Sequence, residues 1–120
     1  MQTPRKLTLH QQAVLIQVLL MFPDQHVDVR YCPLASDALS YAQNFLTIFK
    51  VIGWKVHPPS ESLTAHPGLA FAVGGQGVLP PSAEALRDAL RIYGIDVATV
   101  SDPARETTAA DFVLAIGSEA

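Results

Sequence analysis

A glycine-rich segment in the second half of the chain contains the residues best suited to chemistry. Gly74-Gly75-Gln76-Gly77 follows a short apolar run, and Ser82 stands at the start of a helical pattern. In a strand–loop–helix arrangement, backbone N–H groups of such a loop can converge on an anion at the helix N-terminus. The segment therefore predicts a site for a small anionic ligand, such as a nucleotide or a phosphate, lined by Gly74, Gly75, Gln76, Gly77 and Ser82.

The same loop has two other interpretations. Glycines also serve in turns that need a positive φ, and a plain turn is the interpretation we favour. The triplet Gly-Gly-Gln resembles the motif of class I peptide-chain release factors, but the usual continuation is absent because Gly77-Val78-Leu79 follows. Neither a Walker lysine nor a G-x-G-x-x-G pattern accompanies the loop, so a nucleoside triphosphate or a dinucleotide is not expected.

Other residues that could do chemistry do not form a coherent set. Cys32 follows the first predicted strand, and only the fold could bring His57 near it, so we interpret Cys32 as a small buried hydrophobe. The four histidines show no i, i+4 pair and no H-E-x-x-H motif, so we expect no metal site and no cofactor. Asp102 and Asp111 offer a pair of carboxylates, although a turn before Pro103 explains Asp102. We therefore expect the chain not to be an enzyme.

Composition limits the class of protein. The chain has 120 residues, the size of one domain, and 49% of them are hydrophobic while 16% are charged. Its mean hydropathy of +0.25 is high, so the excess apolar surface requires a thick core or an interface. The net charge of −3 and the scattered Lys and Arg argue against a nucleic-acid partner. The single cysteine excludes an internal disulfide and fits a reducing compartment, so we expect a cytoplasmic protein.

The N-terminal region predicts an apolar helix over residues 8–22. Thr8 and Gln11 form a capping box, and Pro23 ends the pattern. The run is too short to span a bilayer, which takes about 20 apolar residues. Because most of its circumference is apolar, we expect burial on two sides, one against the sheet and the other against a large core or a second copy of the chain. The face expected to form this interface comprises Leu9, Ala13, Ile16 and Leu20.

Residues 26–118 predict an α/β core built from two related halves. If the first half is shifted along the sequence, Gly53 aligns with Gly94 and Phe49 aligns with Leu90. Each half has the order strand, helix, glycine and strand, which is typical of a βαβ unit with a right-handed crossover. The expected strands are 27–31, 54–57, 69–73, 95–100 and 112–117.

The segment between the two halves shows no helical pattern, which determines whether a parallel or a mixed sheet is expected. The order βαββαβ-β favours a mixed sheet of four to five strands over a fully parallel one. We therefore predict an α/β (α+β) fold within a single domain, residues 1–120, with two main helices packed on the sheet. The N-terminal helix is expected against an edge or the other face of the sheet.

This order of elements resembles a known family. Gly53-Trp54-Lys55-Val56, the strand Leu69–Val73 and the closing Asp111–Gly117 are similar to the LytR-type C-terminal domain and to uncharacterised soluble domains that bacteria attach to membrane helices. The resemblance covers residues 26–118 and implies a small accessory domain without established catalytic residues, so it transfers no site. The chain departs from that pattern because the apolar helix stands where the end of a membrane anchor would be.

Together these patterns predict a non-catalytic interaction or sensory module that self-associates, as a homodimer, through its N-terminal helix. The partner is then a second copy or another protein. The alternative is a domain that binds a small anionic ligand with the 74–77 glycine loop.

Overall fold

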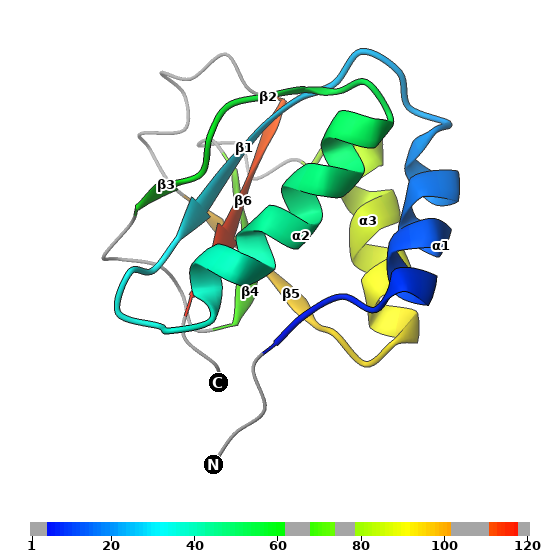
Figure 1. Ribbon diagram of the computed structural model, residues 1–120. Coiled ribbons are helices and arrows are strands. Elements are labelled where there is room, and N and C mark those ends of the chain that lie inside the picture. The colour runs from blue at the N-terminus through cyan, green and yellow to red at the C-terminus, as the bar shows by residue number, and fades with distance from the viewer. Residues whose placement is uncertain (1–4, 62–67, 74–78, 102–110, 118–120) are drawn as a thin grey trace.

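The computed structural model describes residues 5–61, 68–73, 79–101 and 111–117. Within these ranges the chain forms three helices and six strands (Figure 1). In chain order they are α1 (Leu9–Leu19), β1 (His26–Tyr31), α2 (Ala38–Val51), β2 (Lys55–Val56), β3 (Ser60–Glu61), β4 (Leu69–Val73), α3 (Pro81–Ile92), β5 (Val97–Ser101) and β6 (Phe112–Ile116).

The six strands form one mixed sheet, and its central strand is β6. The strand order is β2-β1-β6-β4-β5, and β3 also pairs with β1. β6 runs parallel to β1 and antiparallel to β4, whereas the outer pairs β1–β2 and β4–β5 are both parallel. The prediction of a mixed sheet in an α+β fold is confirmed. The additional strand β3 lies outside the five strands expected from the sequence and pairs with the end of β1.

The two βαβ units end their helices in the same way. Gly53 and Gly94 have φ values of 83° and 76°, the left-handed conformation that glycine adopts readily after a helix. In both units the N–H of the residue after the glycine donates a hydrogen bond to the carbonyl of the residue four positions before the glycine. The aligned inward positions are also fully buried in both units: Ala42 and Ala83, Phe45 and Leu86, Phe49 and Leu90. The alignment of the two halves in sequence therefore corresponds to a repeat in structure.

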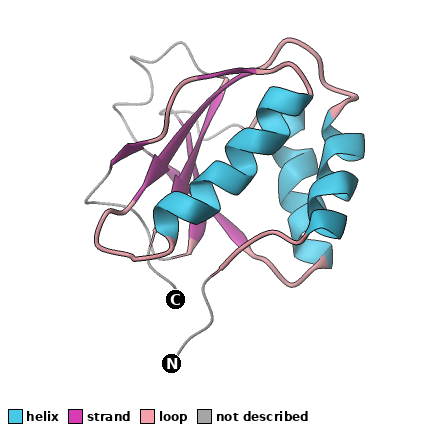
Figure 2. Ribbon diagram, in the orientation of Figure 1, coloured by secondary structure: helices cyan, strands magenta, loops and turns pink. Residues whose placement is uncertain are grey.

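The helices lie on one side of the sheet in two layers. α2 and α3 cover the sheet, and α1 packs on both of them from outside (Figures 1 and 2). The prediction that the N-terminal helix lies against an edge or the other face of the sheet is therefore wrong. Leu15 and Leu19 are fully buried because they fill the groove between the other two helices.

The N-terminal end of α1 follows a local signal in the sequence, and its C-terminal end does not. Thr8 Oγ1 accepts a hydrogen bond from the N–H of Gln11, and the side chain of Gln11 accepts one from the N–H of Thr8. The predicted capping box is thus confirmed. The helix ends at Leu19, before the predicted end at residue 22.

Aromatic rings connect α2 to the central strand. Phe49 stacks on Trp54 with 5.2 Å between ring centroids, and Phe112 meets both rings edge-on. Phe71 of β4 contacts Phe112 edge-on from the other side at 5.3 Å. The indole N–H of Trp54 donates to the carbonyl of Phe22 at 2.7 Å. The segment that follows α1 is therefore held by the same aromatic cluster.

Arg5 attaches the N-terminal segment to the rest of the fold. Its guanidinium donates to both carboxylate oxygens of Asp37 at 2.9 and 3.0 Å and to the carbonyl of Gly117, and it lies over the ring of Tyr41. Asp37 is the N-cap residue of α2, but its carboxylate makes no capping hydrogen bond. Because hydrogen bonds from Arg5 favour the charged form, the pKa of Asp37 is lowered from 3.8 to about 2.

Candidate functional site

Most of the predicted anion site lies outside the described residues. The glycine loop Gly74–Gly77 falls within the range 74–78 that the structure does not describe. Ser82 is described, and it lies in the first turn of α3 with only 1% of its surface exposed. Its hydroxyl donates to the side-chain oxygen of Gln25 at 2.8 Å, which joins α3 to the segment before β1. Anion binding by this loop stays a prediction.

The face of α1 expected to meet a second copy is largely exposed. Leu9 is 84% exposed and Leu20 is 57% exposed, and Ala13 is exposed between them. Ile16 differs from these residues because it is half-buried against the core. Met21, just beyond the helix, adds a fifth apolar side chain that is 79% exposed. We use the term α1 stripe for Leu9, Ala13, Leu20 and Met21.

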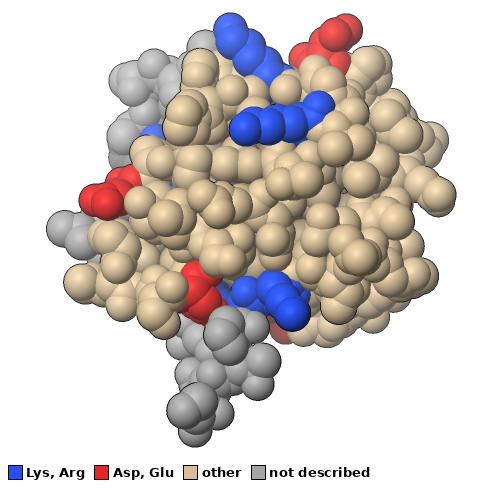
Figure 3. Space-filling view, in the orientation of Figure 1, with Lys and Arg blue, Asp and Glu red and all other residues tan. Residues whose placement is uncertain are grey.

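The surface around the α1 stripe has few charges. No charged residue occurs between Lys6 and Asp24, and Lys50 is the only one in α2. Figure 3 shows the result, a broad uncharged area over α1 and the middle of α2. Two further exposed hydrophobic side chains, Val51 and Ile92, lie at the C-terminal ends of α2 and α3. A contiguous uncharged surface of this kind is typical of an interaction site.

Two hollows lie elsewhere on the described surface. One, of about 370 Å³, runs along α2 and is lined by Gln43, Leu46, Thr47, Lys50, Pro58 and Pro59. The other, of about 210 Å³, is lined by Arg5, Tyr41, Gly68, Leu69, Gly94, Ile95 and Asp96. Among the described residues, neither lining includes a cysteine, a serine or a histidine. Neither hollow therefore offers the nucleophile–histidine pair that covalent catalysis needs.

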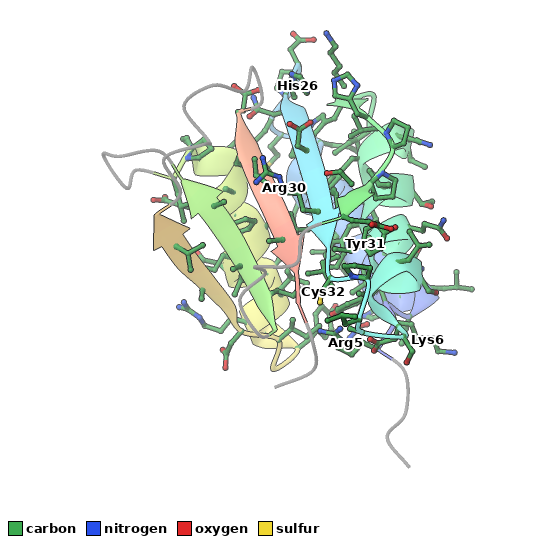
Figure 4. The ribbon with its side chains drawn as sticks, turned by 90° about the vertical axis from the view of Figure 1, so that its left-hand side faces the viewer. Arg5, Lys6, His26, Arg30, Tyr31 and Cys32 are labelled. Atoms are coloured by element: carbon green, nitrogen blue, oxygen red, sulfur yellow. The ribbon has the colours of Figure 1, made fainter. Side chains whose placement is uncertain are left out.

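The fold separates Cys32 from His57. Cys32 is a free thiol, 9% exposed, at the end of β1 (Figure 4). β2 pairs in parallel with the start of β1, so His57 is level with Asp28. Cys32 is four residue steps further along the chain, a distance of about 13 Å in a strand. The structure therefore supports the interpretation of Cys32 as a small buried hydrophobe.

The fold instead places His57 beside His26 and Asp28, an arrangement that the sequence reasoning missed. The potential ligand atoms of these three residues all lie within 4.8 Å of one another. Val27 and Val29 point into the core, so His26 and Asp28 share the opposite face of β1. The pattern His-x-Asp in a predicted strand could have indicated this shared face. The contribution of His57 depends on strand pairing, which no local pattern reveals.

Asp111 has a structural role next to this cluster. Its carboxylate accepts a hydrogen bond from the N–H of His26 at 2.7 Å, and its own N–H donates to the carbonyl of His26 at 2.6 Å. These two bonds fix the start of β6 against the start of β1. Asp102, the other carboxylate of the predicted pair, lies outside the described residues.

Comparison with known proteins found no relative of this chain. No protein-family model, no curated protein and no solved structure matches the chain. Among the helices that the structure describes, none has both the length and the apolar character required to cross a membrane.

Proposed function

We propose that this chain is a non-catalytic interaction module that self-associates as a homodimer through the α1 stripe. The observation that supports the proposal is the exposure of large apolar side chains, with Leu9 at 84%, Met21 at 79% and Leu20 at 57%, in a segment that holds no charged residue between Lys6 and Asp24. Burial of apolar surface is the dominant favourable contribution to most protein–protein association.

A second copy of the chain is the partner that best fits this surface. The surface offers no ionic complementarity, so an equally uncharged and apolar surface is the best match for it. Two-fold pairing places the same patch opposite itself and closes the assembly at two copies. The resemblance of the core to LytR-type C-terminal domains, which implies an accessory role without catalytic residues, agrees with this proposal.

Sedimentation of the wild type and two variants at micromolar concentration tests the dimer. Leu9→Glu places a charge on the α1 stripe at the first residue of the helix, where an acidic side chain is favourable for helix stability. We expect the wild type to sediment as a dimer and Leu9→Glu as a monomer with an unchanged circular dichroism spectrum.

Leu34→Glu is the matched control. Leu34 is also 84% exposed, but it lies in the connection between β1 and α2, away from the α1 stripe. This variant is expected to remain dimeric. A wild type that is monomeric at these concentrations, or equal dissociation in the two variants, would contradict the proposal.

A further inference from the structure

The geometry points to a binding site for Zn²⁺ formed by His26, Asp28 and His57, with a fourth coordination position open to water or to an external ligand. We refer to these three residues as the His–Asp–His cluster. It lies at the start of β1, on the face of the sheet opposite the helices, where Figure 4 shows His26. This site is independent of the α1 stripe, because the sheet and two helices lie between them.

Strand alternation and register place the three side chains on one face. In β1, Val27 packs into the core, so the residues on either side of it point the other way. Val56 of β2 is the register partner of Val27 and also packs against the core. The residue after Val56 is His57, which therefore points to the same face as Asp28, directly across the strand pair.

The distance between the ligand atoms of His26 and Asp28 is close to that which a tetrahedral metal requires. Zn–N and Zn–O bonds of about 2.0–2.2 Å separate tetrahedral ligand atoms by roughly 3.3–3.6 Å. Nε2 of His26 lies 3.7 Å from Oδ1 of Asp28, so this pair already approaches that separation. The rings of His26 and His57 have centroids 5.0 Å apart. His57 is exposed and follows the two-residue strand β2, so its imidazole has room to rotate toward the other two ligands.

One nitrogen atom of the cluster is buried without a hydrogen-bond partner among the described residues. Nε2 of His26 is buried and has no hydrogen-bond partner in the part of the chain that the structure describes. Its 3.7 Å distance from the carboxylate of Asp28 is too long for a hydrogen bond. A buried polar atom without a partner is rare in folded proteins and needs an explanation. The lone pair of a neutral imidazole directed at a metal ion would supply one.

The ligand types determine which metal the cluster favours. Two imidazoles and one carboxylate suit Zn²⁺ and similar transition metals, whereas Mg²⁺ and Ca²⁺ prefer sites made only of oxygen ligands. Three protein ligands leave one position of a tetrahedral zinc ion open, as in zinc sites that bind water or a substrate. Asp28 also takes part in another interaction, which a carboxylate can keep with one oxygen while the other binds the metal.

Calorimetric titration of the full chain with ZnCl₂ tests the site. We expect saturable binding of one Zn²⁺ per chain, and no comparable binding of MgCl₂ or CaCl₂. His57→Gln removes an exposed ligand without disturbing the core, and it should weaken zinc binding by more than about ten-fold. Histidine side-chain NMR gives a second measurement, in which zinc shifts the ring nitrogens of His26 and His57.

His10→Gln is the matched control because His10 is an exposed histidine on α1, where its ring contacts Tyr93. This variant should bind zinc as the wild type does. The absence of saturable zinc binding, equal affinity in His57→Gln and wild type, or equal weakening by the two variants would each overturn the inference. Because none of these outcomes depends on association state, failure of the metal site is distinguishable from failure of the dimer.

Discussion

At the scale of single residues, Arg5 has more long-range contacts than its place near the start of the chain suggests. It joins the N-terminal segment to the first residue before α2 and to the carbonyl that follows β6. The carboxylate of Asp37 is 12% exposed and accepts a bidentate pair, the geometry in which an ion pair is strongest. This pair is therefore a stabilising contact and not only a surface charge.

Asp37→Asn should reduce stability in a way that depends on pH. The pKa of Asp37 is 3.8 in the unfolded chain and about 2 in the folded one, so the ionised carboxylate stabilises the folded state. This contribution is complete above about pH 4 and is lost as the pH falls through about 2. We expect the variant to lose at most about 2 kcal/mol of unfolding free energy at pH 7 and very little near pH 2. Urea unfolding at several pH values measures the difference.

Asp88→Asn is the control for this experiment. The side chain of Asp88 is 62% exposed and pairs with the neighbouring Arg87, so its loss should change stability by only a few tenths of a kcal/mol. A difference between wild type and Asp37→Asn that does not vary with pH would show that charge is not the cause.

At the scale of elements, the molecule is two βαβ units joined through one strand. Each unit reverses direction after its helix at a glycine with positive φ, and each then continues into an edge strand, β2 or β5. At Gly53 and at Gly94, a Cβ would meet no atom within 4 Å. The backbone conformation, and not the available space, is therefore the reason for glycine.

Replacement of these glycines by alanine and by asparagine separates conformation from size. Gly53→Ala and Gly94→Ala should each lower the unfolding free energy by about 1–2 kcal/mol, because left-handed backbone is unfavourable for residues with a Cβ. Gly53→Asn and Gly94→Asn should lose less, since asparagine tolerates this conformation although it is larger. Chemical denaturation of the four variants measures the effect. Equal losses for alanine and asparagine would contradict the explanation.

Local sequence signals were enough to predict much of this architecture. The Thr8–Gln11 capping box, the glycines that end α2 and α3, and the spacing of buried residues such as Phe49 each depend on neighbours within a few positions. The mixed sheet could also be predicted. The stretch between the two halves shows no helical pattern, and a parallel connection between neighbouring strands usually contains a helix.

The remaining features depend on contacts between distant parts of the chain. The register of β1 and β2 places His57 beside Asp28, and no pattern around either residue encodes that register. The position of α1 is set by the groove that α2 and α3 leave, so its apolar circumference alone could not distinguish a helix from a sheet as its neighbour. The pairing of Arg5 with Asp37 likewise joins residues that are 32 positions apart in the sequence.

At the scale of the whole molecule, the helical layers and the sheet separate the two proposed binding sites. The α1 stripe lies on the outer helical layer, and the His–Asp–His cluster lies on the opposite face of the sheet. A substitution in one of these two sites therefore does not contact the residues of the other site.

Self-association predicts that thermal stability depends on protein concentration. Because a dimer is favoured at high concentration and the unfolded chain does not associate, the midpoint of unfolding should rise as concentration increases. Differential scanning calorimetry over a hundred-fold range of concentration should show this rise for wild type and Leu34→Glu but not for Leu9→Glu. A midpoint that is constant for all three proteins would contradict the dimer.

The central position of β6 has a consequence for the order in which the protein forms. In the described sheet, β1 and β4 are connected only through β6, although both are synthesised long before it. While the chain grows on the ribosome, the first βαβ unit has no strand to join it to the second. The sheet is completed only after residues 112–116 have left the exit tunnel. The complete core is therefore assembled after both units have been synthesised.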